Sequence, residues 1–255
     1  MIVWRIIYWI KFLPGRLTAT KRKLPDFLII GVPKSGSTFL FEMLNKHPNI
    51  KGASLKEPHY FDLNYSKGEN YYRGFFPFKS EGKTTGEASV NYFYSENAAN
   101  RIKQDLPNVK LILLLRNPVE RAYSHFQMNK NDLREKNFDK IIGSENTENK
   151  RYGFLEKGKY SKYLSMWNSR FKANQLLILK SEDLFENASH EIQKVLQFLN
   201  EEKFEMNDLK PINQRSYKEL NIETHNSLNS FYKPFNDDLE KQLGVNFTWK
   251  SIEGG

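Results

Sequence analysis

Short apolar runs and longer helical patterns alternate along this chain. Residues 26–30 and 109–115 are mainly apolar stretches, which are typical of strands buried on both faces of a parallel sheet. Residues 37–46 follow the first stretch, place apolar side chains at helical spacing and end before Pro48. This order predicts a strand, a short loop and a helix near the start of the chain.

The same alternation continues to the end of the chain. After the second apolar stretch, Asn117 fits a helix N-cap, Pro118 the first helical position and Glu120 the third, and this helix is predicted to reach about residue 130. Residues 136–150 are polar and predict a loop. Further strands are predicted at residues 84–88 and 175–179, and further helices at 95–106, 159–172, 191–199 and 225–243. Strands that alternate with helices predict an α/β fold, a three-layer sandwich around a central parallel sheet.

The N-terminal segment, residues 1–23, differs from the rest of the chain, and we expect residues 24–255 to form a single domain. The segment is apolar and aromatic, but Arg5 and Lys11 interrupt it well before the roughly 20 residues that span a bilayer. No small-residue cleavage site follows, which disfavours a signal peptide. Two interpretations stay open: a helix packed on the domain, or an interfacial anchor that makes peripheral membrane contact through residues 1–13.

The amino-acid composition excludes several kinds of chemistry but leaves the class of binding partner open. The chain has no cysteine, which excludes a disulfide framework and a thiolate nucleophile and suits a reducing compartment. We therefore expect a cytoplasmic protein, peripheral at the inner membrane face if the N-terminal segment is an anchor. The five histidines are scattered without metal-ligand spacing, so we expect no metal site. The net charge of +9 fits either a lysine-rich solvated surface or an anionic partner such as a nucleotide, an acidic glycan, a nucleic acid or a membrane surface.

The sequence GVPKSGST, residues 31–38, lies between the first predicted strand and its helix. Gly31 and Gly36 have the spacing of a Walker A loop, but Ser37 stands at the lysine position and the lysine is Lys34. A glycine- and serine-rich loop at a helix N-terminus binds phosphate through backbone N–H groups and the positive helix end. The pattern predicts a P-loop-like strand-loop-helix phosphate site.

The end of the second predicted strand carries an arginine. A P-loop nucleoside triphosphatase needs an acidic residue on a neighbouring strand to hold magnesium. The strand at 109–115 ends instead on Arg116, which can bind an anion directly. A second anion receptor is therefore predicted beside the first, and an ATPase is disfavoured.

The two motifs together, PKSGST at 33–38 and RNPVERAYS at 116–124, resemble those of sulfotransferases that use 3′-phosphoadenosine-5′-phosphosulfate (PAPS). The resemblance implies that Arg116 and Ser124 bind the 3′-phosphate. It also implies that the 5′-phosphosulfate is bound by Lys34, Ser35, Gly36, Ser37 and Thr38.

Further segments resemble the heparan-type glycan sulfotransferases, and the resemblance extends over about residues 27–249. KEPHYFD at 56–62 resembles the segment that carries their catalytic glutamate; GEASVNY at 86–92, GKY at 158–160 with Trp167, and NFTW at 246–249 resemble other blocks. The chain departs from the pattern at Ala88, where these enzymes have lysine. It also lacks their cysteine-bearing basic loop, and Arg215 and Lys218 are the candidates for cofactor contacts in that region.

These motifs predict roles for individual residues. Lys34 would neutralise the charge that grows on the departing phosphate oxygen. Glu57 is the first choice for the base that takes the acceptor's proton, with His59 as the alternative, and Asp62 and Glu87 are candidates for orienting these two groups or the acceptor.

The predicted activity is transfer of a sulfuryl group from PAPS, without metal, to a hydroxyl, less readily an amine, of a saccharide acceptor: a polysaccharide or a glycolipid headgroup. Two alternative functions are a nucleotide-dependent phosphoryl transferase and a non-catalytic nucleotide or nucleic-acid binding module. Neither accounts for both motifs, and we expect no nucleic-acid partner.

Overall fold

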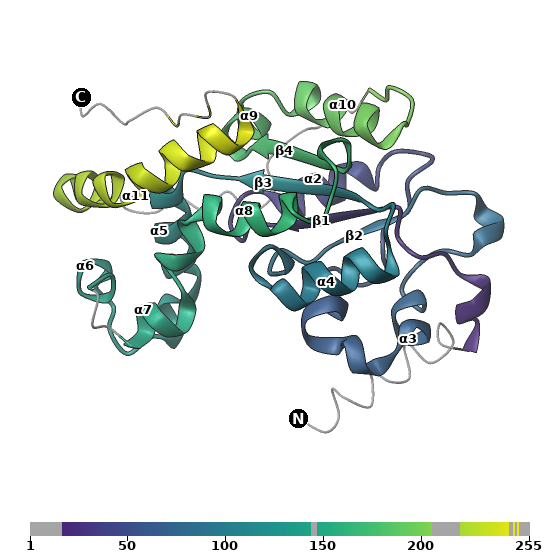
Figure 1. The fold of residues 1–255 in the computed structure, drawn as a ribbon, viewed down its shortest axis with the longest axis horizontal. Helices are drawn as coiled ribbons and strands as arrows, with labels where there is room; N and C mark the ends of the chain where they lie inside the picture. The colour runs from purple at the N-terminus through teal and green to yellow at the C-terminus, as the bar shows by residue number, and fades with distance from the viewer. Residues whose placement is uncertain (1–16, 144–146, 206–219, 245–246, 248, 250–255) are drawn as a thin grey trace.

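The computed structural model describes residues 17–143, 147–205, 220–244, 247 and 249. Its centre is a sheet of parallel strands in the order β2-β1-β3-β4 (Figure 1). The strands are β1 (Phe27–Gly31), β2 (Gly86–Ala88), β3 (Lys110–Leu115) and β4 (Leu176–Lys180). The longer helices are α2 (Ser37–Leu44), α4 (Glu96–Asp105), α5 (Pro118–Asn129), α8 (Tyr160–Asn168), α10 (Ala188–Leu199) and α11 (Ile222–Leu243). The shorter ones are α3 (Glu69–Arg73), α6 (Phe138–Ile141), α7 (Thr147–Tyr152) and α9 (Ser181–Glu186), with single turns η2 (Tyr60–Asn64), η5 (Tyr92–Tyr94) and η7 (Glu156–Gly158).

The sheet is covered by helices on both faces, as the continuous apolar runs predict. Successive residues of β1 and β3 point to opposite faces, so Leu28 and Ile30 belong to one core cluster and Phe27 and Ile29 to the other. The first cluster includes side chains of α4, α8 and α11, and the second includes side chains of α2, α9 and α10. The three-layer α/β prediction is confirmed (Figure 1).

The register places the strand ends that carry the motifs at one edge. In β1, Phe27 pairs with Gly86 of β2 and with Lys110 of β3, and all three strands run in the same direction. The carboxyl end of β1, where the phosphate loop begins, therefore lies between the carboxyl ends of β2 and β3. Ligands of parallel α/β sheets bind at this edge.

Most predicted elements are confirmed to within a few residues, and one region is wrong. Residues 136–150, predicted to be a loop, contain α6 and the beginning of α7. The reason is local capping together with long-range packing. The side chain of Asn137 accepts hydrogen bonds from two backbone N–H groups of α6. Phe138 and Ile141 pack in a third apolar cluster beside α5.

The two interpretations of the N-terminal segment depend on residues 1–16, which lie outside the described residues. The end of that segment packs on the domain: Arg22 donates to the carbonyl of Phe76 and lies 4.2 Å from the centroid of the Phe78 ring. Within the described ranges, no helix has the length and apolar character needed to cross a membrane.

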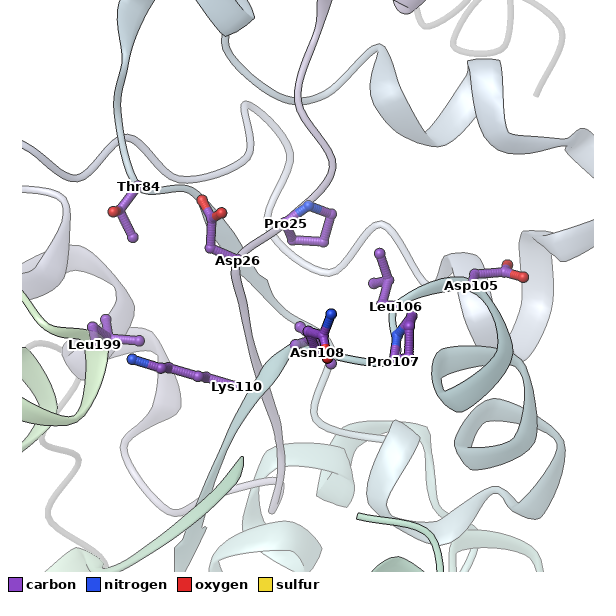
Figure 2. Close-up of a pocket in the computed structure, with 10 residues that line it drawn as sticks. Pro25, Asp26, Thr84, Asp105, Leu106, Pro107, Asn108, Lys110 and Leu199 are labelled. Carbon is purple, nitrogen blue, oxygen red and sulfur yellow. The ribbon is translucent and has the colours of Figure 1, made fainter. Parts of the chain in front are cut away.

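A pocket of about 440 Å³ opens at the amino ends of β1 and β3 (Figure 2). Its lining includes the side chains of Asp26, Asp105 and Lys110. This edge is opposite to the one that carries the phosphate loop, so the pocket is separate from the candidate active site.

Candidate active site

The phosphate loop is fastened to the sheet by its own polar groups. The hydroxyl of Ser35 is fully buried and donates to the carbonyl of Val32 at 2.6 Å. The hydroxyl of Ser181, which follows β4, donates to the carbonyl of Ser35 at 2.8 Å. The hydroxyls of these two serines thus hold the loop in shape.

Gly36 is required by the path of the loop. It is the N-cap of α2 and has a φ of 90°, in the left-handed region. A side chain there would be strained by this conformation, and its β-carbon would lie 2.8 Å from Cζ of Phe185, whose ring would have to shift. Gly36 has no side chain with which to cap this helix end, and Ser37 and Thr38 form its first turn. The N–H groups of that turn are positioned for an anion.

Arg116 lies beside the phosphate loop, as the strand order requires. Its guanidinium donates to the carbonyl of Lys34 at 3.0 Å and lies 3.8 Å from the carboxylate of Glu120. The hydroxyl of Tyr160 donates to the carbonyl of Arg116 at 2.8 Å and holds the turn after β3. The structure therefore brings the two sequence motifs into direct contact.

The α5 helix, which begins just after Arg116 and carries Ser124, also reaches the phosphate loop. Asn117 caps α5, as predicted, and accepts from the N–H groups of Val119 and Glu120. Ser124 lies two turns from Asn117 on this helix and is buried. On the following turn, the thioether of Met128 lies 3.8 Å from the amine of Lys34. The phosphate-loop lysine and α5 thus border one space.

Glu57 and His59 lie on a turn that docks against the end of β2. The backbone N–H of His59 donates to the hydroxyl of Ser89, one residue beyond β2. The imidazole Nδ1 is 3.0 Å from the carboxylate of Asp62, and Nε2 is 3.5 Å from that of Glu57. Lys56 lies 2.7 Å from the other oxygen of Glu57. These residues form one charge array at the carboxyl edge of the sheet.

The charges of this array follow from its contacts. Hydrogen bonds with Asp62 and then Glu57 raise the pKa of His59 to about 10. Hydrogen bonding to His59, and further to Lys56, lowers the pKa of Glu57 to about 2. At neutral pH His59 is an imidazolium without a lone pair for a proton, whereas Glu57 is an acceptor. The geometry favours Glu57 as the base.

Backbone strain marks the same residues. Among the described residues, the non-glycine positions with positive φ are Lys34 at 73°, Glu57 at 59°, His59 at 48° and Asn200 at 64°. Asn200 ends α10, an ordinary place for this conformation. The other three are the candidate catalytic residues. Such strain costs about 1–3 kcal/mol each and concentrates at functional sites.

Glu87, on β2, is fully buried and interacts electrostatically with His59. The hydroxyl of Tyr72 is 3.2 Å from one carboxylate oxygen, and the other oxygen has no hydrogen-bond partner within the described part of the chain. Burial raises the pKa of Glu87 to about 7. The native state therefore holds this proton more tightly than the unfolded state.

Replacing Glu87 by glutamine is expected to change the pH dependence of stability. As pH rises from about 4.5 to 7, the unfolded chain loses this proton first, so the wild-type protein is destabilised by about 3 kcal/mol at most, and the loss levels off above pH 7. Glu87→Gln removes that loss. Urea unfolding of both proteins at pH 5 and pH 8 measures it; an unchanged difference between the two proteins at both pH values contradicts the assignment.

Several further aromatic residues of this part of the chain lie in the core. The aromatic residues Tyr71, Tyr72, Phe75 and Phe76 are buried and belong to one core cluster. Tyr160 and Trp167 are also buried. Arg215 and Lys218 lie outside the described residues. The described residues contain no group of three or more histidine, aspartate or glutamate side chains that could hold a metal ion.

Sequence reasoning missed Glu182, which links the site to the C-terminal region. One carboxylate oxygen accepts from the backbone N–H of Asn117 at 2.8 Å, and the other accepts from the indole of Trp249 at 3.1 Å. The signal was available: Glu182 comes two residues after β4, at the edge where ligands bind.

The comparison with protein families identifies the class. The model of the sulfotransferase domain matches residues 24–251, so the chain belongs to the sulfotransferase family. It is 28% identical over 256 residues to human heparan sulfate glucosamine 3-O-sulfotransferase 3B1, covering 89% of this chain and 65% of that protein. It is 35% identical over 188 residues to mouse heparan sulfate glucosamine 3-O-sulfotransferase 5, covering 70% and 54%. The chain thus spans less than two thirds of the length of either relative.

Solved structures agree on the fold. A sulfotransferase from Alicyclobacillus acidocaldarius superposes with a TM-score of 0.75 at 24% identity, covering 88% of this chain and 97% of the other. The mouse sulfotransferase SULT7A1 complexed with PAP superposes with a TM-score of 0.55 at 15% identity, covering 88% of each chain. At these identities the likeness concerns the fold alone.

Proposed function

We propose that this protein transfers a sulfuryl group from PAPS to a hydroxyl, less readily an amine, of a saccharide acceptor. The observation that carries the proposal is the hydrogen bond from Arg116 to the carbonyl of Lys34, which joins two anion receptors at the carboxyl edge of the sheet. Membership of the sulfotransferase family supports the reaction type.

The residues at this edge fit the donor. PAPS carries anionic groups on both its 5′ and 3′ sides, and it supplies the activated sulfuryl group and a bisphosphate leaving group when bound. The uncapped start of α2 and the close turn at Gly36 suit the 5′ side. Arg116, with Ser124 on α5, suits the 3′-phosphate. The receptor pair matches a nucleotide with two separated anions.

Lys34 and Glu57 have complementary tasks in this proposal. The ammonium of Lys34 stabilises negative charge as it grows on the leaving oxygen. Glu57 accepts the proton of the acceptor hydroxyl. Because Lys56 and His59 weaken Glu57 as a base, this proton moves late, when the acceptor oxygen already bonds to sulfur and its proton is more acidic. Asp62 keeps His59 charged and in place.

The acceptor class rests on the relatives and on the turn that carries Glu57. The curated relatives described above are named for heparan sulfate glucosamine, and the segment KEPHYFD resembles their catalytic segment. The net charge of +9 suits an acidic polysaccharide or the headgroup of a glycolipid. A phosphoryl transferase is disfavoured because Arg116 stands where a magnesium-binding acid is needed.

The direct test is incubation with labelled PAPS and a panel of polysaccharides, glycolipids and small alcohols, with products identified by mass. Sulfated saccharide is expected, and the rate is expected to be unchanged by a chelator. Turnover of phenols or simple alcohols alone would refute the acceptor class. Phosphorylated product from ATP would refute the reaction type.

The protein is expected to bind adenosine 3′,5′-bisphosphate (PAP) much more tightly than 5′-AMP. Arg116→Ala should weaken PAP binding by about tenfold or more, since a hydrogen bond between charged groups contributes about 1.5–3 kcal/mol. Calorimetry measures both affinities, and Arg134→Ala, at an exposed arginine, is the control. Equal affinity of the wild-type protein for the two nucleotides would remove Arg116 from the 3′-phosphate.

A further inference from the structure

The segment of residues 154–158, between α7 and α8, is held by side chains from three other elements. The carbonyl of Phe154 accepts from the buried guanidinium of Arg121 on α5. The carbonyl of Leu155 accepts from the hydroxyl of Tyr232 on α11 at 2.9 Å. The carbonyl of Lys157 accepts from the hydroxyl of Tyr94 in η5 at 2.8 Å. These hydrogen bonds hold the backbone of Lys157 in place, so its side chain extends from a fixed position.

Lys157 differs from the lysines that follow it. Lys159 and Lys162 both pair with Glu156, at 2.9 and 2.5 Å. The half-buried amine of Lys157 has no carboxylate within salt-bridge distance among the described residues; its polar contact is the amide oxygen of Asn91 at 3.5 Å. A cation held partly out of water without a counter-ion is costly, which makes it a candidate for binding an anion.

Contacts on one side connect Lys157 to the candidate base. Asn91 follows β2 and comes two residues after Ser89. Ser89 accepts the hydrogen bond from the backbone of His59, whose ring contacts Glu57. The amine of Lys157 therefore lies at the same edge of the sheet as the turn that carries the base.

Contacts on the other side connect it to the phosphate loop. The ring of His125 packs edge-on against Phe154, with centroids 5.0 Å apart. His125 follows Ser124 on α5, and one turn later Met128 contacts the amine of Lys34. A chain of contacts therefore runs from the phosphate loop through α5 to the 154–158 segment, and Lys157 connects that segment to the end of β2.

The electrostatics of His125 agree with this placement. Burial, and then the charges of Arg121, Lys157 and Lys34, lower the pKa of His125 to about 3. The imidazole is therefore neutral, and its Nδ1 has no hydrogen-bond partner within the described ranges. The positive charges of three separate segments therefore act on the same imidazole, that of His125, beside the candidate active site.

We propose that Lys157 is a further catalytic residue, whose ammonium binds the sulfonate oxygens of the group in transfer. This inference rests on the proposed function. The bond between sulfur and the phosphate oxygen breaks, the bond between the acceptor oxygen and sulfur forms, and Glu57 takes the acceptor proton. Lys157 stays protonated throughout and acts by charge and hydrogen bonding, opposite Lys34 across the sulfuryl group.

The test compares Lys157→Met with a matched control, Lys159→Met, two residues away and paired with Glu156. Calorimetry without acceptor measures the affinities for PAPS and for PAP, which differ by the sulfuryl group. Lys157→Met is expected to weaken PAPS binding by about tenfold or more and PAP binding by less than about threefold. Its kcat should fall by a similar factor at saturating acceptor, with KM for the acceptor nearly unchanged. Lys159→Met should match the wild-type protein.

A second variant keeps the lysine and changes its partner. Asn91→Asp puts a carboxylate at the position now 3.5 Å from Lys157, so the same selective loss of PAPS affinity is expected. Equal losses for PAPS and PAP would overturn the inference, as would a rise in acceptor KM alone, which would assign Lys157 to an anionic group of the acceptor. If the wild-type protein forms sulfated product and Lys157→Met behaves in the same way as the wild-type protein, only this inference is overturned. A wild-type protein without sulfated product overturns the proposed function itself.

Discussion

Lys34→Ala is expected to lower kcat by about 10²–10³-fold and the affinity for PAP by less than about tenfold. The charge that Lys34 meets grows only as the bond to sulfur breaks, so its contribution is larger in the transition state than in the ground state. The loop itself should persist, because the Ser35 and Ser181 hydroxyls and the Gly36 turn hold it independently of the lysine side chain.

Steady-state kinetics and calorimetry on the same preparation separate the two effects. Lys46→Ala is a suitable control, since Lys46 is exposed just beyond the other end of α2. A Lys34→Ala protein with near-normal kcat would exclude this lysine from the mechanism. A proportional loss of kcat/KM and PAP affinity at unchanged kcat would make it a binding group only.

Glu57→Gln is expected to lower kcat by about 10²–10⁴-fold with PAP binding retained, since a positioned base contributes a factor of this size. Glutamine keeps the shape of the side chain and removes its ability to take a proton. His59→Gln should lose less, because the imidazolium at this position holds Glu57 and does not itself accept the proton.

The pH profile separates these roles. In the wild-type protein the pKa of Glu57 is held at about 2, mainly by its hydrogen bond with His59, so the base stays ionised at moderately acidic pH. In His59→Gln that hydrogen-bonded cation is lost, the pKa of Glu57 moves up toward its ordinary value, and the acid limb of kcat should shift to higher pH. An inactive His59→Gln beside an active Glu57→Gln would require the two roles to be exchanged.

Both predictions depend on features that the sequence reveals to different degrees. The strand-loop-helix of β1 and α2 was predictable because a continuous apolar run, two spaced glycines and a helical repeat lie within about twenty residues of one another. The Asn117 cap was predictable for the same reason. The predicted loop at 136–150 was wrong because the packing of Phe138 and Ile141 against α5 cannot be read from the polarity of the segment.

The choice of Glu57 as the base shows what the sequence alone cannot decide about the site. The motif singled out Glu57 and His59 together and left the base open between them. Hydrogen-bond geometry favours Glu57, because Asp62 and Glu57 on either side of the imidazole keep His59 charged. Lys157 gave no signal at all in the sequence, because it is one of many lysines in a basic chain. Its contacts reach residues more than sixty positions away.

The amino-acid sequence by itself determined the α/β class, the phosphate loop with its displaced lysine, and Arg116 at the end of a neighbouring strand. Each of these follows from short-range patterns of polarity, glycine and capping residues. Only the tertiary structure decided which charges meet. The parallel register brings the ends of β1, β2 and β3 to one edge, and there the contact of Arg116 with the loop, the charge state of His59 and the contact of the Lys157 amine with Asn91 arise from segments distant in the chain. Charge interactions depend on distance and burial, and folding alone sets both.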